Sequence, residues 1–340
     1  MHISAFHSRD WHLPKFGAAL CGDMTDVERL GLPRYYVAGR LDKKIAQAYQ
    51  DCLGLSAMKL IDIMQSERLS LPERIAAGNL ISLTGDSRLS TLQPDMITVE
   101  GGEVQLGLAF EDVDKVLLDF AELGLKRSWI EKECPAYSAN LQSYRIAKYP
   151  VTNQEYRDFL LATGYPEIPS SWDFRRYPLE RANHPVFTVS PQAADDYVKW
   201  LSGTTGRAFC LPTEAQWEWA ASGSNRLEFP WGNVFDADLA NTAESGIFTT
   251  TPVGVFLGGE SPFGLSDMAG NVEEYVADSY QPYPGGHLIV DHLTEIHGAY
   301  RVARGGSFAR FRDLLRTRRR HGHNPKSPTY AMGFRVAETL

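Results

Sequence analysis

Five short signatures, rich in turn-forming residues, follow one another along this chain between residues 148 and 335. They are Lys148–Asn153 (KYPVTN), Leu211–Trp219 (LPTEAQWEW), Asp267–Glu274 (DMAGNVEE), Arg304–Phe308 (RGGSF) and Gly333–Arg335 (GFR). Glycine, proline, asparagine and helix-capping residues specify the backbone one turn at a time. Together the signatures predict a domain in which long ordered loops outweigh regular strands.

The bulk composition is that of a soluble protein. The chain has 340 residues, of which 43% are hydrophobic and 22% charged, and this length favours two domains. No apolar run reaches the roughly 18 residues of a membrane helix, and Met1–Asp10 has no signal-peptide pattern, so we expect a cytoplasmic protein. The net charge of −8 disfavours nucleic acid and membranes as partners, because both attract excess positive charge. No C-x-x-C spacing links the cysteines, so we expect reduced thiols at Cys21, Cys52, Cys134 and Cys210.

Apolar residues recur at helical spacing in three segments before residue 92. The segments are Leu41–Cys52, Leu60–Met64 and Ile75–Leu83. They predict a small helical unit over residues 1–91. Because such a unit is too small to bury a large core of its own, we expect it to dock on the rest of the chain.

The remainder, residues 92–340, has the pattern of an α+β domain. Alternating apolar residues predict strands at Met96–Val99 and Tyr144–Tyr149. Capping residues predict helices that begin at Thr152, Ser190 and Thr213. After Gly223 there is almost no helical periodicity, and a last strand is predicted at Gly333–Ala337. We therefore expect a small antiparallel sheet joined by long ordered loops.

In the order, spacing and wording of the five signatures, residues 94–338 resemble the formylglycine-generating enzyme family, also called the sulfatase-modifying factors. The resemblance implies a C-type-lectin-like α+β fold with small antiparallel sheets and long ordered loops, here with a small N-terminal helical unit. It does not imply one activity. The family includes copper-dependent oxidation of a sulfatase cysteine, iron-dependent sulfoxide synthesis, a pyoverdine-maturation oxidation, and ligand-binding proteins without catalysis.

The positions that hold copper in the formylglycine-generating enzymes carry no thiol in this chain. By the family pattern, the two catalytic cysteines would follow Ser307 at positions now occupied by Arg310 and Leu315. Cu(I) is a soft ion that requires thiolate ligands. We therefore expect a divergent member that does not generate formylglycine.

A different redox metal has a candidate site near the C-terminus. The iron histidines of the sulfoxide synthases come largely from an added helical bundle, but residues 35–90 contain no histidine. His321 and His323 alternate on an extended segment, which places both imidazoles on one side. Glu273 stands where the family usually has a tryptophan that faces the active cleft. These three residues are a candidate site for iron or copper, and two solvated histidines are the alternative.

Seven arginines lie between residues 304 and 320, where the only acid is Asp313. Guanidinium groups pair with carboxylates and phosphates. This segment therefore predicts an anionic substrate bound by Arg310, Arg316 and Arg319. The alternative is that most of these arginines bind carbonyls and buried acids inside a fold that is short of regular structure.

The resemblance also implies a structural calcium ion. The matching loop offers the carboxylates of Asp267 and Glu274 and the carbonyls of Gly270 and Val272. Hard oxygen donors on a tight glycine-containing loop suit calcium. A calcium-free, hydrogen-bonded loop is the alternative.

A second calcium site of the family has a weaker match. It would use Asn241 and the carbonyls of Thr242 and Ile247, but Ser245 replaces the usual aspartate. The lost charge makes this site doubtful unless Glu244 compensates.

Two functions from different classes remain open. The first is a metal- and oxygen-dependent oxidoreductase on a small amino-acid-derived or peptide substrate, with Ser307, Arg310 and Glu273 as its catalytic residues. The second is a non-catalytic lectin-like module that binds an anionic ligand or a protein partner and holds no metal but calcium. The loss of both cysteines favours the second, whereas the histidine pair with Glu273 favours the first, to which we lean. The oligomeric state stays open.

Overall fold

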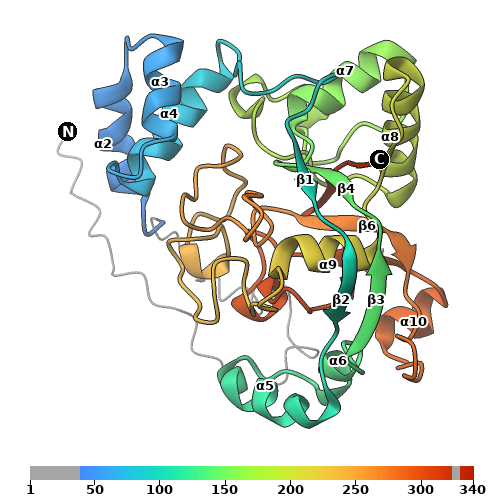
Figure 1. The fold of residues 1–340 in the computed structure, drawn as a ribbon. Helices are drawn as coiled ribbons and strands as arrows, with labels where there is room; N and C mark the ends of the chain where they lie inside the picture. Colours follow the sequence, from blue (N-terminus) through green and yellow to red (C-terminus); the bar gives the residue numbers. More distant parts are fainter. Residues whose placement is uncertain (1–38, 324–329) are drawn as a thin grey trace.

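The computed structural model describes residues 39–323 and 330–340 (Figure 1). Cys21 lies outside these residues. Within them, Cys52, Cys134 and Cys210 are free thiols, and no helix has the length and apolar character needed to cross a membrane.

Three helices form the N-terminal unit, shown in blue in Figure 1. They are α2 (Asp42–Cys52), α3 (Ala57–Met64) and α4 (Leu71–Ser82). Ser70 caps α4, because the carboxylate of Glu73 accepts hydrogen bonds from the Ser70 N–H and hydroxyl. The apolar core of the three helices continues onto Val255 and Phe256 of the main domain. The unit therefore shares a core with the rest of the chain.

Buried polar contacts also fix the helical unit to the main domain. Asn183 Nδ2 donates a hydrogen bond of 3.0 Å to the Gly78 carbonyl in α4. The ring of His184 lies between two partners, with Nε2 2.9 Å from Asn79 Oδ1 and Nδ1 3.1 Å from Thr250 Oγ1. His184 is 3% exposed, so it joins α4 to a loop of the main domain inside the protein.

Within the described residues, the main domain has a four-stranded and a two-stranded antiparallel sheet, and a further sheet is described below. The four strands, in spatial order, are β1 (Met96–Val99), β4 (Tyr144–Ala147), β10 (Ala337–Thr339) and β5 (Phe209–Cys210). The two-stranded sheet pairs β2 (Gly102–Leu106) with β3 (Tyr137–Leu141). The small antiparallel sheets expected from the sequence are thus confirmed.

A further four-stranded sheet carries parts of three signatures. Its order is β8 (His321–Gly322), β7 (Arg301–Arg304), β6 (Glu273–Ser279) and β9 (Met332–Phe334). β7 runs antiparallel to both neighbours, whereas β6 and β9 are parallel, which the sequence did not indicate. The single last strand that was predicted is wrong, because the chain passes from β9 to β10 in another sheet. The buried Arg335 makes this crossing, and its guanidinium bonds Glu274 and the Ala147 carbonyl.

The helices of the main domain surround these sheets. They are α5 (Val113–Asp119), α6 (Arg127–Glu131), α7 (Asn153–Thr163), α8 (Pro191–Thr205), α9 (Glu214–Ser222) and α10 (His292–His297). The predicted capping residues begin α7, α8 and α9, and a left-handed glycine ends α7 at Gly164. Figure 1 shows α7 and α8 at one end of the molecule and α5 and α6 at the other.

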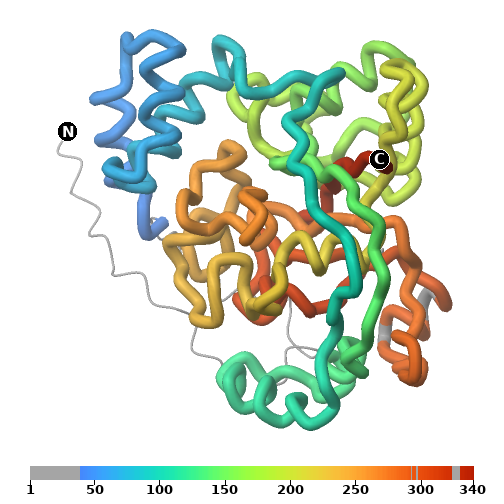
Figure 2. The backbone as a smooth tube through the Cα atoms, in the orientation of Figure 1, coloured from blue at the N-terminus to red at the C-terminus, as the bar shows by residue number. Residues whose placement is uncertain are grey.

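The long segment between α9 and β6 has no regular strand or α-helix. It appears in yellow and orange in Figure 2, where it fills the middle of the molecule beside the helical unit. This arrangement matches the loop-rich domain that the signatures predict. The loop ends in the signature that starts β6, and so it positions the first residue of the candidate site.

Candidate functional site

The candidate site lies on one face of the sheet β8-β7-β6-β9. Successive side chains of a strand point to opposite faces, so Glu273 and Tyr275 of β6 share a face that Glu274 does not. Tyr275 is the partner of Ala303 in β7, and Ala303 is the partner of His321 in β8. His321 therefore lies on the same face as Glu273, with the small Ala303 of β7 between β6 and β8.

Glu273 is the buried centre of the site. It is 1% exposed, and its two carboxylate oxygens accept hydrogen bonds from Arg310 Nε at 3.0 Å and from His321 Nδ1 at 2.5 Å. Burial would raise the pKa of Glu273, but the electrostatic effects and hydrogen bonds of His321 and Arg310 outweigh it and lower the pKa to about 2. Glu273 is thus a carboxylate at neutral pH.

His321 is neutral at the same pH. Burial lowers the pKa of His321 to about 4, although the Glu273 carboxylate acts in the opposite direction. A neutral imidazole carries one proton, and the bond to Glu273 places it on Nδ1. Nε2 then carries a lone pair, and it makes no hydrogen bond to any described residue.

Arg310 is held through one nitrogen of its guanidinium group. Its Nε is bound to Glu273, and its side chain is 24% exposed. Nη1 and Nη2 make no hydrogen bond within residues 39–323 and 330–340. The arrangement leaves the outer edge of a fixed guanidinium available to an anion.

Ser307 precedes Arg310 by three residues, and its carbonyl accepts a hydrogen bond of 2.9 Å from Arg310 N. It is 0% exposed, and its hydroxyl has no hydrogen-bond partner in the described part of the chain. The preceding Gly306 has φ +65°, and a Cβ there would lie 3.0 Å from the backbone of Leu314, which explains the glycine. Phe308 N donates to the Asn271 carbonyl at 3.1 Å, and this contact holds the RGGSF loop against the start of β6.

Six half-buried residues lie in or beside segments whose backbones contact the start of β6 and its neighbour β9, and we call them the rim. The rim consists of Phe187, Phe308, Arg310, His321, His323 and Tyr330. Phe187 and Phe308 meet edge to face with ring centroids 5.4 Å apart. The rings of His323 and Tyr330 are tilted by 31°, with centroids 3.8 Å apart. One aromatic pair adjoins Arg310 along the chain, and the other adjoins His321.

The backbone next to Phe187 is strained, and hydrogen bonds on either side of it keep this conformation. Thr188 has φ +59°, a left-handed conformation that a β-branched residue rarely adopts. Its hydroxyl accepts a hydrogen bond of 2.8 Å from Ser171 N, and Val189 N bonds the carbonyl of Met332 at 3.5 Å. Met332 pairs with Glu273 across the sheet. Strain of this kind persists where the surrounding structure enforces it, often at functional sites.

The three predicted iron ligands do not fit a metal as they stand. Both oxygens of Glu273 already accept hydrogen bonds from Arg310 and His321. In the part of the chain that the structure describes, no three His, Cys, Asp or Glu side chains are grouped as a metal site requires. His321 and His323 do share the rim, but Glu273 is an ion-pair partner here.

The two positions that hold the copper ligands in the family pattern, Arg310 and Leu315, lie in different surroundings in this structure. Arg310 is part of the rim, and Leu315 is 0% exposed in an apolar core with Phe311 and Val113. Cys134 lies in the same core, and burial raises its pKa to about 12. A thiol with so high a pKa is not a thiolate at neutral pH.

Two of the arginines predicted to bind substrate are structural. Arg316 is 0% exposed and bonds Glu133 at 2.9 Å, and Arg319 is 3% exposed and lies 3.7 Å from Asp313. They belong to an internal network of five arginines and five acids: Arg304, Arg316, Arg318, Arg319 and Arg320 with Glu133, Glu214, Glu218, Glu228 and Asp313. The alternative interpretation of the arginine cluster therefore holds for Arg316 and Arg319, because Glu133, Glu228 and Asp313 neutralise them.

The predicted calcium ligands have protein partners instead. Both oxygens of Glu274 accept hydrogen bonds from Arg335, and one also accepts from Trp217 Nε1. Asp267 accepts from Gly254 N at 2.7 Å and from Asn271 Nδ2 at 3.2 Å. With the charge of Glu274 neutralised by Arg335, this donor set does not fit a calcium ion, although Gly270 and Val272 remain beside it.

Hydrogen bonds occupy the second calcium position as well. The Ser245 hydroxyl lies 2.7 Å from the Thr242 carbonyl and 3.3 Å from Asn241 Oδ1. Glu244 accepts from Arg312 N at 3.0 Å, and burial raises the pKa of Glu244 to about 7. The proton of Ser245 thus lies where a cation would bind these oxygens, and the set with Ile247 does not fit calcium.

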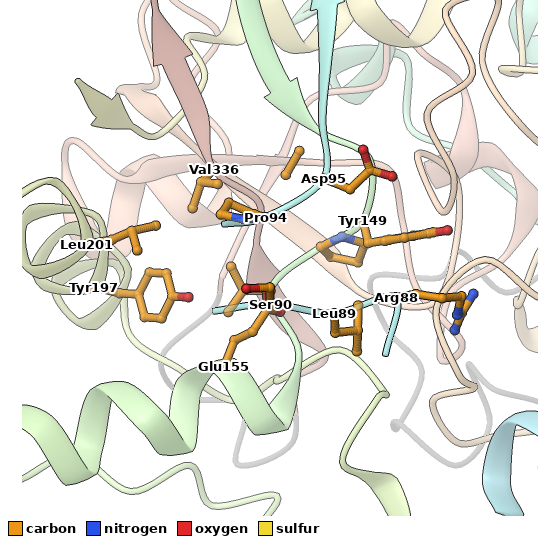
Figure 3. Close-up of a pocket in the computed structure, with 13 residues that line it drawn as sticks. Arg88, Leu89, Ser90, Pro94, Asp95, Tyr149, Glu155, Tyr197, Leu201 and Val336 are labelled. Atoms are coloured by element: carbon orange, nitrogen blue, oxygen red, sulfur yellow. The ribbon is translucent and has the colours of Figure 1, made fainter. Parts of the chain in front are cut away.

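A small cavity lies elsewhere in the molecule. Figure 3 shows Tyr197, Glu155 and Ser90 close together, with Arg88 and Tyr149 farther along. The cavity has a volume of about 20 Å³, which is room for about one water molecule. No rim residue lines it, so it is not a substrate site.

The sequence analysis singled out the polar residues of this candidate site but not its aromatic residues. Ser307, Glu273, Arg310 and the two histidines were all singled out. Phe187, Phe308 and Tyr330 were not, although Phe308 belongs to the RGGSF signature. A partly exposed aromatic residue beside a predicted polar site is the signal that would have found it.

Comparisons with known proteins agree with this fold. Residues 84–340 match the family model described as the sulfatase-modifying factor enzyme 1-like domain. The chain is 34% identical over 267 residues to the serine/threonine-protein kinase Pkn1 of Chlamydia trachomatis, covering 73% of this chain and 39% of that protein. It is 27% identical over 241 residues to hercynine oxygenase of Mycobacterium tuberculosis, covering 61% of this chain and 55% of that protein. The structure of PvdO from Pseudomonas aeruginosa matches with a TM-score of 0.56 and 25% identity, covering 74% of this chain and 96% of PvdO.

These similarities have limits. The chain spans about two fifths of the kinase's length and about half of the oxygenase's length. It contains neither the His-Arg-Asp nor the Asp-Phe-Gly tripeptide, on which a protein-kinase active site depends. The kinase name thus belongs to that relative, of which this chain matches only a part.

Proposed function

Because this chain belongs to the sulfatase-modifying factor family, in which one of its relatives is an oxygenase, we propose that it binds a small amino-acid derivative or a peptide through a carboxylate held by Arg310. The observation that supports the proposal is the partly exposed guanidinium group of Arg310, which is bound to the protein through Nε alone. Its Nε is fixed on Glu273, while Nη1 and Nη2 have no partner among the described residues. Two parallel N–H groups on one guanidinium suit a carboxylate, which accepts two hydrogen bonds at once.

The charge of the site favours a carboxylate over a phosphate. Arg310 and Glu273 are oppositely charged and 3.0 Å apart, so together they are neutral. A carboxylate adds one negative charge beside the guanidinium. A phosphate monoester adds nearly two, which Glu273 repels at short range in a partly buried site. The net charge of −8 acts in the same direction.

His321 supplies the second polar contact. Its Nε2 lone pair accepts a hydrogen bond from an N–H or O–H group of the ligand. Because Glu273 holds Nδ1–H, the ring keeps one orientation and one tautomer. An amino-acid derivative or a peptide end offers both a carboxylate and an N–H group, and a site with one guanidinium and one acceptor suits that combination.

A second candidate function is metal- and oxygen-dependent oxidation of the same ligand. The two rim histidines His321 and His323 favour it, since Nε2 of His321 is open, and so does the similarity to hercynine oxygenase. Iron would require another ligand in place of the engaged Glu273, so we derive no reaction step from it.

Titration calorimetry with N-acetylglycine tests the binding function. This probe has a carboxylate and one amide N–H and no side chain. We expect Arg310→Gln to weaken its binding about tenfold or more, as loss of a charge-assisted hydrogen bond does. The control is Arg176→Gln, which changes an exposed arginine far along the chain. Equal affinity in wild type and Arg310→Gln would refute the proposal.

Metal content separates the two candidates. Elemental mass spectrometry on protein purified without a histidine tag measures iron and copper in the wild type and in a His321→Ala, His323→Ala double variant. Stoichiometric metal that disappears in the variant supports the oxidoreductase. Protein that binds N-acetylglycine without either metal is a binding module.

A further inference from the structure

We infer that the rim selects a ligand in which the carboxylate is attached to an aromatic group. The inference rests on the proposed carboxylate site and adds the chemistry of the rest of the ligand. It is carried by the two aromatic pairs of the rim, which no part of the carboxylate site requires.

The aromatic pairs border the two polar contacts. Phe308 lies two residues before Arg310, and its ring meets Phe187 at 5.4 Å and 77°. His323 lies two residues after His321 on an extended segment, and its ring lies 3.8 Å from Tyr330. A ligand whose carboxylate meets Arg310 therefore places its remaining atoms among aromatic side chains.

The Phe187–Phe308 pair carries two features that are unfavourable for folding, namely exposed ring surface and a strained neighbouring residue. Both rings are half-buried, so apolar ring surface is left in water. The backbone beyond Phe187 is strained at Thr188, with φ +59°, and the part-buried hydrogen bond from Ser171 N to the Thr188 hydroxyl maintains this conformation. Folding alone gains little from a strained turn that holds a phenylalanine partly exposed. Contact with the aromatic ring of a ligand would bury the exposed surface of Phe187 and Phe308.

The geometry of the pair suits an aromatic partner more than an aliphatic one. Rings at right angles expose one edge and one face, and a third ring can add to such a pair edge to face. Aromatic pairs contribute more than the burial of their area alone. An aliphatic side chain gains only the burial. The rim is therefore expected to distinguish a ring from a branched alkyl group of similar size.

Four probes separate the carboxylate from the ring: N-acetyltyrosine has both, N-acetylleucine has the carboxylate and an alkyl group, N-acetylglycine has the carboxylate alone, and N-acetyltyrosine amide has the ring alone. We expect N-acetyltyrosine to bind about tenfold more tightly than N-acetylleucine, the ratio that two aromatic contacts give. The amide is expected to bind more weakly than the acid by a similar factor, since it lacks the charge that meets Arg310.

Variants assign the preference to the rim. Phe308→Leu and Phe187→Leu should each reduce the ratio between the affinities for N-acetyltyrosine and N-acetylleucine. Both affinities are measured in the same variant. Phe110→Leu is the matched control, because Phe110 is 46% exposed and precedes α5, away from the rim. Thermal unfolding of each variant shows whether it is folded. If Phe187→Leu does not fold, Phe308→Leu alone tests the aromatic preference.

The outcomes distinguish the inference from the function on which it rests. Equal binding of N-acetyltyrosine and N-acetylleucine overturns the aromatic preference and leaves the carboxylate site intact. No binding of any acid, or binding that Arg310→Gln does not weaken, overturns both. Equal binding of the acid and the amide shows a ring site without a carboxylate contact and also overturns both.

Discussion

Protonation of His184 should weaken the protein, because this residue joins the helical unit to the main domain as a neutral ring. It is 3% exposed, and burial, assisted by the positive charge of Arg181, lowers its pKa to about 3. In the unfolded chain the pKa of histidine is about 6.5. The unfolded state therefore binds more protons than the folded state between these values, and stability falls as the pH falls below 6.5.

The magnitude follows from the difference in pKa. Each pH unit in this window changes the free energy of unfolding by about 1.4 kcal/mol. At pH 5 the solution is about 1.5 units below the unfolded pKa and still above the folded one, so His184 costs about 2 kcal/mol relative to pH 8. The loss is large beside the 5–15 kcal/mol, roughly, by which most domains are stable.

The assay compares the wild type with His184→Gln. Glutamine does not titrate, and its side-chain amide can donate to Asn79 Oδ1 as the Nε2–H of His184 does. Urea unfolding at pH 8 and pH 5 gives the change in free energy for each protein. We expect this change to be about 2 kcal/mol smaller in the variant. Other groups, such as His321, titrate in both proteins and cancel. The same pH dependence in both proteins would refute the reasoning.

Further predictions concern the buried ion pair, the RGGSF loop and calcium. Arg335→Met leaves the buried carboxylate of Glu274 without its charged partner, so urea unfolding should show a loss of about 3–5 kcal/mol, and a loss below 1 kcal/mol, roughly the value of a surface pair, would contradict the structural role. Gly306→Ala forces an alanine to φ +65° and its Cβ to 3.0 Å from the Leu314 backbone, so it should cost about 1–2 kcal/mol or more in the same assay, and wild-type stability would show that the loop adapts. The melting temperature of the wild type should not change with EDTA or added calcium, because the Ser245 hydroxyl donates to an oxygen of the second calcium position. A rise in the melting temperature on addition of calcium would contradict the view that hydrogen bonds take the place of calcium there. Ser245→Asp restores a carboxylate there and should make the melting temperature depend on calcium.

The turn-by-turn signatures and the caps of the helices could be predicted from the sequence. Thr152 bonds Glu155 and Thr213 bonds Gln216, as the spacing of three residues indicates. Gly164 ends α7 in the left-handed conformation. These contacts join residues within one turn, so their geometry depends on local spacing alone. The family, and with it the fold, followed from five such local patterns in order.

The pairing of charges could not be predicted in the same way. In the sequence, Arg316 and Arg319 belong to a basic segment whose only acid is Asp313, and such a segment predicts anion binding. Their partners Glu133 and Glu228 lie far earlier in the chain, and only folding brings them together. The sequence shows which charges exist, but the distance between them depends on tertiary structure.

The same limit applies to the candidate site. Sequence reasoning named Glu273, His321 and Arg310 individually, and it assigned Glu273 to a metal because a carboxylate beside two histidines is a common ligand set. In the fold, β6 and β8 lie on either side of β7, so the carboxylate meets a guanidinium and an imidazole N–H at hydrogen-bond distance. Phe187 reaches the same rim from a loop more than a hundred residues before Phe308. Local sequence thus determined the turns, the helix caps and the residue types that this protein could use. The partners of each charged group and the aromatic pairs of the rim were decided by contacts between distant segments, because the energies of these contacts depend on separation and burial.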